Sequence, residues 1–67
     1  MKPKYIVKGS GKERNFENKT DAVDYIKSQL SRGNMNVGTV SIWEDGSYHL
    51  IERWSIKNGK YTKVIPQ

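Results

Sequence analysis

The chain has 67 residues, a net charge of +5, no cysteine and a single histidine. This length corresponds to one small domain with a marginal core. Without cysteine there is no disulfide framework, and one histidine cannot supply a structural zinc site. No stretch reaches the roughly 20 apolar residues that a membrane span requires, and the start "MKPKYIVKG" lacks the apolar run of a signal peptide. We therefore expect one cytoplasmic domain, residues 1–67, with no membrane association.

Charge is unevenly distributed along the chain. Residues 1–19 carry a net charge of +4 and residues 53–67 also carry +4, whereas residues 37–52 carry three acids and no base. Basic surfaces attract nucleic acid or acidic proteins. A net charge of this size is also ordinary for a small domain, where it serves solubility. The charge is therefore compatible with a nucleic-acid partner but does not require one.

The first two predicted elements are short strands. "KYIVKG" at 4–9 has the Tyr, Ile and Val typical of a strand, and "ERNFE" at 13–17 can return beside it. The glycines of "GSGK" at 9–12 indicate a turn between the two strands. This pattern predicts an N-terminal hairpin with a basic tip.

Residues 18–34 form the strongest helical pattern. Asn18 is a suitable N-cap because its side-chain oxygen can accept a bond from an N–H group of the first turn. Gly33 suits the position after the last turn, where a positive φ is common. An apolar stripe recurs at helical spacing and consists of Ala22, Val23, Ile26 and Leu30. This stripe should pack on a sheet.

The remainder predicts a meander of three strands at 37–43, 47–57 and 60–65. The last two strands are joined by Asn58-Gly59, and a two-residue Asn-Gly loop is the strongest short signal for a hairpin. The element order is therefore β-β-α-β-β-β. The expected fold class is α+β, with one helix packed on a mainly antiparallel sheet.

The turn in "WEDGSY" decides which side chains of the meander share a face, because a one-residue shift turns a whole strand over. A two-residue Asp45-Gly46 loop would place Val40 and Ile42 on the face opposite Trp54. A three-residue loop that ends at Gly46 in a bulge brings all three onto one face. Burial of each aliphatic side chain is worth ~1.5–3 kcal/mol. We therefore predict the three-residue loop.

In this register one face of the meander becomes the core. The predicted core side chains are Val40, Ile42, Tyr48, Leu50, Trp54 and Ile56, joined across the last hairpin by Tyr61 and Ile65. Glu52 and Lys63 also point to this side, and we place them at its periphery, paired with each other or reaching water. Phe16 and one side of the first strand complete the core.

The opposite face should carry an indole among cations. Its candidate binding residues are Trp43, His49, Ile51, Arg53, Lys57 and Lys60. Such a face can bind nucleic acid, with aromatics stacked on bases and cations on phosphates. It can also bind another protein or a second copy of the chain, since Trp and Arg are favoured anchors. A third alternative is that the N-terminal hairpin folds over it as a second small core.

Catalytic chemistry finds little support in the sequence. "KGSGKE" at 8–13 departs from a phosphate-binding loop, which requires G-x-x-x-x-G-K-[ST] leading into a helix. His49 lies near Ser47, but a Ser–His pair needs an orienting acid and an oxyanion hole. Asp21 and Asp24 are explained by the helix start that they occupy. We predict that the protein is not an enzyme and has no cofactor, no metal and no small-molecule substrate.

The run "KYIVKG…RNFENKTDAVDYIKSQL…TVSIWEDGSY" resembles a pattern of small bacterial and phage domains of the ββαββ type. The resemblance spans about residues 4–48 and rests on Phe16, Lys19, Ala22, Asp45 and Gly46. It implies a strand pair, a helix and a meander, and it implies no site residues, since such domains often have no assigned activity. The Lys- and Asn-rich composition is also similar to that of small phage and prophage proteins of low-GC bacteria.

These observations predict a non-enzymatic small binding module, phage- or prophage-encoded, that acts by protein–protein contact or self-association. The contact would use the outer sheet face or a sheet edge. The alternative is a nucleic-acid-binding protein that uses the basic and aromatic sheet face. Salt dependence separates the two, because phosphate contacts release counterions and weaken steeply as salt rises.

Overall fold

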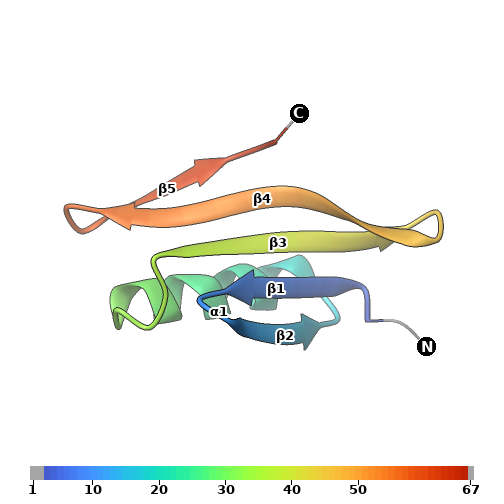
Figure 1. The fold of residues 1–67 in the computed structure, drawn as a ribbon, viewed down its shortest axis with the longest axis horizontal. Coiled ribbons are helices and arrows are strands. Elements are labelled where there is room, and N and C mark those ends of the chain that lie inside the picture. The colour runs from blue at the N-terminus through green and yellow to red at the C-terminus, as the bar shows by residue number, and fades with distance from the viewer. Residues whose placement is uncertain (1–2, 67) are drawn as a thin grey trace.

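A computed structural model describes residues 3–66, which form one helix packed on a five-stranded antiparallel sheet (Figure 1). The elements are β1 (Tyr5–Gly9), β2 (Lys12–Phe16), α1 (Lys19–Ser31), β3 (Val37–Glu44), β4 (Ser47–Lys57) and β5 (Lys60–Val64). The α+β class and the order β-β-α-β-β-β are confirmed. In the sheet the strands lie in the order β2-β1-β3-β4-β5, so β2 and β5 are the edges.

The N-terminal hairpin extends the sheet. β1 pairs antiparallel with β3, and Val7 lies opposite Val40 in that ladder. Both side chains are buried against α1, which packs across β1, β2, β3 and β4 (Figure 1). The alternative in which this hairpin folds over the outer sheet face is therefore wrong.

The helix begins and ends as its sequence predicts. Asn18 is the N-cap, and its Oδ1 accepts a hydrogen bond from the backbone N–H of Asp21 at 2.8 Å. The helix ends at Ser31, and Gly33 then adopts a φ of +75° in the left-handed region that glycine favours. Local chemistry thus fixes both ends, independently of the sheet.

The core lies between α1 and the central strands. Its buried apolar side chains are Val7, Ala22, Ile26, Leu30, Met35 and Val40. The helix approaches the sheet most closely at Gly38, where a Cβ atom would lie only 2.9 Å from Cγ2 of Ile26. Three members of the predicted stripe are fully buried, whereas Val23 is half-buried and packs at the side. Gly38 therefore allows the helix to sit directly on β3.

The turn between β3 and β4 differs from the prediction. Glu44 pairs with Ser47, and Asp45 and Gly46 have φ values of 52° and 85°, so the loop has two residues. The predicted three-residue loop is wrong. Asn58-Gly59 forms the expected two-residue turn, with positive φ at both positions. The mirror-image turn suits the right-handed twist of the strands, which favours it at both hairpins.

The extra residue lies within β4 instead of at the turn. Val40 pairs with Glu52, but Ser41 pairs with Leu50, so Ile51 has no partner of its own and forms a bulge. The bulge restores the alternation, so Val40 and Trp54 share the helix face as predicted. Between the bulge and the turn the alternation is reversed. Tyr48 and Leu50 therefore point to the outer face, and their predicted core positions are wrong.

Candidate functional site

The outer face is the face of the sheet turned away from α1. Strand pairing places the following residues on it: Ile6, Lys8, Glu13, Asn15, Val37, Thr39, Ser41, Trp43, Tyr48, Leu50, Arg53, Ser55, Lys57, Lys60, Thr62 and Val64. In the part of the chain that the structure describes, no element covers this face.

Four of the six predicted binding residues lie on the outer face: Trp43, Arg53, Lys57 and Lys60. The other two do not. His49 pairs with Ile42 and lies on the helix face, where it is exposed, whereas Ile51 is the bulge residue and packs against the core. The reason in both cases is the bulge, which reverses the faces of β4 on its two sides.

Aromatic side chains occupy one end of the outer face. Trp43 and Tyr48 pair across the β3–β4 ladder, with ring centroids 4.9 Å apart in an edge-on arrangement. The Tyr48 hydroxyl donates a hydrogen bond to the carbonyl of Pro3 at 2.8 Å. Both rings are half-buried, so this aromatic pair holds the N-terminal segment as well as facing solvent.

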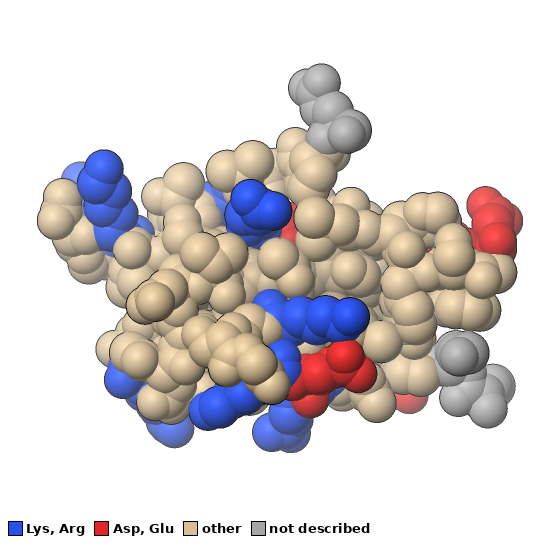
Figure 2. Space-filling model, in the orientation of Figure 1, with Lys and Arg blue, Asp and Glu red and all other residues tan. Residues whose placement is uncertain are grey.

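Basic side chains occupy the other end. The outer face carries the bases Lys8, Arg53, Lys57 and Lys60 and one acid, Glu13, whose Oε1 lies 3.7 Å from Nζ of Lys8. Figure 2 shows basic side chains over the β4–β5 hairpin and an acidic side chain at the opposite end. Tyr48 and Lys57 are separated by roughly 30 Å along β4, at about 3.3 Å per residue. The aromatic pair and the basic hairpin therefore do not form one compact patch.

The β5 edge was not predicted as a site. All five residues of β5 are exposed, and the side chains of Tyr61, Val64 and Ile65 are 42%, 53% and 62% exposed. The predicted burial of Tyr61 and Ile65 is wrong, because α1 does not extend over this edge strand. The Tyr61 hydroxyl instead donates a hydrogen bond to the helix carbonyl of Lys27 at 3.2 Å. The sequence signal for this exposed edge was the position of β5 as the last strand of the predicted meander.

The two edges of the sheet differ in composition. β2 carries three consecutive charged residues, Lys12, Glu13 and Arg14. The Arg14 guanidinium also covers the Tyr25 ring, with Cζ 5.0 Å from the ring centroid. Charged side chains on an edge strand discourage pairing with another chain. The β2 edge is therefore protected, whereas the three central residues of β5 are Tyr61, Thr62 and Lys63, with a single charge among them.

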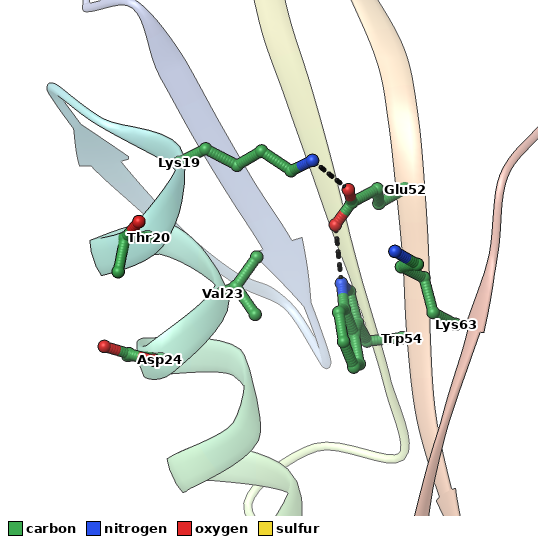
Figure 3. A pocket seen from close by; sticks show the side chains of 7 residues that line it. All are labelled: Lys19, Thr20, Val23, Asp24, Glu52, Trp54 and Lys63. Carbon is green, nitrogen blue, oxygen red and sulfur yellow. Dashed lines mark hydrogen bonds and ion pairs between the residues drawn. The ribbon is translucent and has the colours of Figure 1, made fainter.

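A buried carboxylate lies on the helix face near β5. Glu52 is 3% exposed, although we predicted it at the periphery. It forms an ion pair with Lys19 from the first turn of α1, and the indole Nε1 of Trp54 donates a hydrogen bond to it at 2.9 Å (Figure 3). The bulge turns Glu52 inward, and these two donors satisfy its charge. The expected pairing of Glu52 with Lys63 is replaced by the pairing with Lys19.

The electrostatic balance at Glu52 favours the ionised form. Burial by itself raises the pKa of the carboxyl, but the hydrogen bonds from Lys19 and Trp54 and the charges of Lys19 and Lys63 outweigh it and lower the pKa below its usual value. An open depression of about 340 Å³ adjoins this cluster. Its lining residues are Lys19, Thr20, Val23, Asp24, Glu52, Trp54 and Lys63 (Figure 3). The ion pair with Lys19 links α1 to β4, whereas the hydrogen bond from Trp54 joins two residues of β4.

In residues 3–66 the single histidine lies beside a serine. Within that range no cluster of three His, Cys, Asp or Glu side chains is arranged to hold a metal ion. Nε2 of His49 lies 3.3 Å from Oγ of Ser47 and 3.2 Å from the Glu44 carbonyl oxygen. The same ring nitrogen of His49 thus contacts both groups. The second group is a backbone carbonyl, whereas a catalytic Ser–His pair uses a carboxylate to orient the imidazole ring.

Comparison with protein-family models, curated proteins and solved structures finds no match for this chain. Among residues 3–66 there is no helix with the length and apolar character needed to cross a bilayer.

Proposed function

We propose that this chain is a non-enzymatic binding module that self-associates through the edge of β5. The observation that carries the proposal is the exposure of that edge. Among the described residues, the three most exposed large apolar side chains all lie on β5 or directly after it. Apolar side chains on an open strand edge favour the addition of a strand from another chain.

The backbone of β5 has donors and acceptors placed for such a strand. Lys57 and Lys60 flank a two-residue turn and form a hydrogen-bonded pair, and such pairs alternate along an antiparallel ladder. The N–H and C=O groups of Thr62 therefore point toward β4. Those of Tyr61 and Lys63 point away from β4, toward the outside of the sheet.

A second copy of the chain is the partner that the side chains of β5 fit. Tyr61 and Lys63 lie two residues apart on the same face of β5. In an antiparallel pair, Lys63 of one copy can therefore lie beside the Tyr61 ring of the other. A lysine already lies near this ring, since Nζ of Lys27 is 5.7 Å from its centroid. Pairing over five residues makes a small interface, so we expect a weak dimer with Kd on the order of 10–100 µM.

Sedimentation velocity at two concentrations tests the proposal. We expect the wild-type chain to be mainly monomeric at about 5 µM and mainly dimeric at about 1 mM. In Lys63→Pro the outward-pointing N–H is lost while the ladder with β4 stays complete, so the dimer should be abolished. Lys63→Ala is the matched control, because it removes the same side chain and keeps the N–H.

A wild-type chain that stays monomeric at the higher concentration would overturn self-association. Dimers of equal strength in Lys63→Pro and Lys63→Ala would overturn the use of the β5 edge. Tryptophan fluorescence and thermal unfolding establish that each variant is folded before its association is compared.

A second candidate function is nucleic-acid binding by the outer face. The observation that favours it is the excess of four bases over one acid on a face that no described element covers. Arg53, Lys57 and Lys60 lie on the two strands nearest the β5 edge. Pairing of two β5 strands would therefore bring the basic residues of both copies to the middle of one continuous face, where they could contact phosphates.

A further inference from the structure

The β5 edge restricts how two copies can pair, and this restriction rests on the proposed self-association. In a symmetric antiparallel pair, one residue number lies opposite itself on the twofold axis or two neighbouring numbers share that axis. Pairing neighbouring numbers would set outward-pointing backbone groups against groups that point toward β4. When both partners of each pair belong to β5 (Lys60–Val64), only registers that pair Tyr61 and Lys63 with each other, or each with itself, join donors to acceptors.

The registers centred on Lys63 and Tyr61 are unfavourable. With Lys63 on the axis, two ammonium groups lie directly opposite each other, which destabilises a strand pair. With Tyr61 on the axis, Lys63 lies opposite Gly59, which belongs to the β4–β5 turn and has a φ of +77°. A residue in that conformation does not continue a ladder.

With Thr62 on the axis, Tyr61 lies opposite Lys63 of the second copy, and the same pair occurs twice. Each occurrence is a hydrogen-bonded pair, so the two strands exchange four backbone hydrogen bonds. Each lysine then lies beside a tyrosine ring, as Lys63 lies beside a ring within its own chain, where its Nζ is 5.9 Å from the Trp54 centroid.

The other side chains agree with this register. On the outer face Thr62 meets Thr62 of the second copy in a close, non-hydrogen-bonded pair, which is a favourable cross-strand combination. Lys60 lies opposite Val64 of the second copy, so no like charges face each other. We infer that two copies of this chain pair antiparallel through β5 with Thr62 on the twofold axis, forming a ten-stranded sheet with both helices on one side.

Disulfide trapping tests this register. The chain contains no cysteine, so every disulfide must involve an introduced residue. In the inferred dimer the two Cα atoms of residue 62 lie about 4.5 Å apart, within the range that a disulfide spans. Thr62→Cys should therefore form a covalent dimer readily under mild oxidation. Two copies of residue 64 lie roughly 13 Å apart along the strand, so Val64→Cys alone should be trapped at least about tenfold more slowly.

A mixed experiment makes the register specific. Lys60→Cys and Val64→Cys should each give little covalent dimer alone, but an equal mixture of the two should give a heterodisulfide, because residues 60 and 64 are opposite. Faster trapping of Val64→Cys alone, or no heterodisulfide in the mixture, would overturn the register. If the wild-type chain still dimerises in the sedimentation experiment, self-association stands and only the register is wrong; a monomeric wild-type chain removes both.

Discussion

Val40 and Glu52 lie opposite each other in the β3–β4 ladder, and both side chains are buried beneath α1. Val40 is part of the apolar core, whereas Glu52 carries a charge that Lys19 and Trp54 satisfy. The pair lies directly beside the bulge at Ile51. The bulge therefore determines both which aliphatic side chains form the core and that a carboxylate is buried with them.

Deletion of Ile51 should be tolerated better than deletion of another residue of β4. Without Ile51, Leu50 and Glu52 become neighbours and the ladder becomes regular, with every other side chain on its present face. The variant loses only the contacts of one half-buried side chain, about 1–2 kcal/mol of unfolding free energy. Urea unfolding followed by tryptophan fluorescence measures this loss.

Deletion of Ser55 is the matched control. It leaves the bulge in place and sets Trp54 and Ile56 on opposite faces, so one of them must leave the core face. This variant should lose more stability than the Ile51 deletion. Equal stabilities for the two deletions would contradict the role assigned to the bulge.

Glu52→Gln should change how stability depends on pH. The pKa of Glu52 in the folded chain lies below its unfolded value of about 4.3, so its stabilising contribution is present above that pH and is lost as pH falls through the folded pKa. At pH 7 the variant should be less stable by about 1–3 kcal/mol.

Thermal unfolding of both proteins at neutral and strongly acidic pH measures this effect. The difference between wild type and Glu52→Gln should narrow in acid, because the wild-type carboxylate becomes protonated. Glu17→Gln, at an exposed position, serves as the control and should change stability little. If wild type and Glu52→Gln differ in stability by the same amount at both pH values, the ion pair with Lys19 contributes nothing to stability.

Gly38→Ala should destabilise the packing of α1 on the sheet. The added methyl group would lie 2.9 Å from Cγ2 of Ile26 and 3.0 Å from Sδ of Met35, closer than normal contact. We expect a loss of about 1–3 kcal/mol. Ile26→Leu removes the Cγ2 methyl, so Gly38→Ala should cost less in that background than in the wild type. Additive effects of the two substitutions in denaturant unfolding would argue against this contact.

The second candidate function, nucleic-acid binding, predicts an affinity that depends on the basic residues of the β4–β5 hairpin and on salt. Three phosphate contacts to a single strand predict that affinity falls about 20-fold for a fourfold rise in salt. Gln substitution of Arg53, Lys57 and Lys60 together should remove most of the binding and flatten this dependence. Fluorescence anisotropy of a labelled single-stranded oligonucleotide measures both effects.

A second triple variant controls for net charge. It replaces three bases that do not lie on the outer face, namely Lys12, Lys27 and Arg32. This variant should retain the salt dependence of the wild type. If the two triple variants bind equally, the outer face is not the nucleic-acid interface. If the wild-type chain does not bind the oligonucleotide even at low salt, the proposal of nucleic-acid binding is wrong.

Local signals predicted much of the fold because they act within a few residues. Asn18 caps the helix by a bond to Asp21, and Asn58-Gly59 forms the expected turn. The apolar stripe of the helix is confirmed as its buried side. The placement of Arg53, Lys57 and Lys60 on the outer face is also confirmed, since alternation holds on the β5 side of the bulge.

Positions beyond the bulge could not be predicted in the same way. Two devices, a three-residue loop or a bulge within the strand, both bring Val40 and Trp54 to one face. They differ in the register of pairing and in where the side chains from Ser47 to Ile51 point, Tyr48 and Leu50 among them. The two-residue Asp45-Gly46 turn matches the twist of the strands, so the extra residue is accommodated as a bulge inside β4. Choosing between them requires the geometry of the assembled sheet.

The sequence by itself determined the elements, their caps and the need for one extra residue in the meander, because each depends on neighbours along the chain. Only the tertiary structure decided that the extra residue is Ile51, that Glu52 is buried beside Lys19, and that β5 is an open edge. These features depend on which strands and which helix turn meet in space. Contacts between residues distant in the chain therefore define the candidate interaction surface.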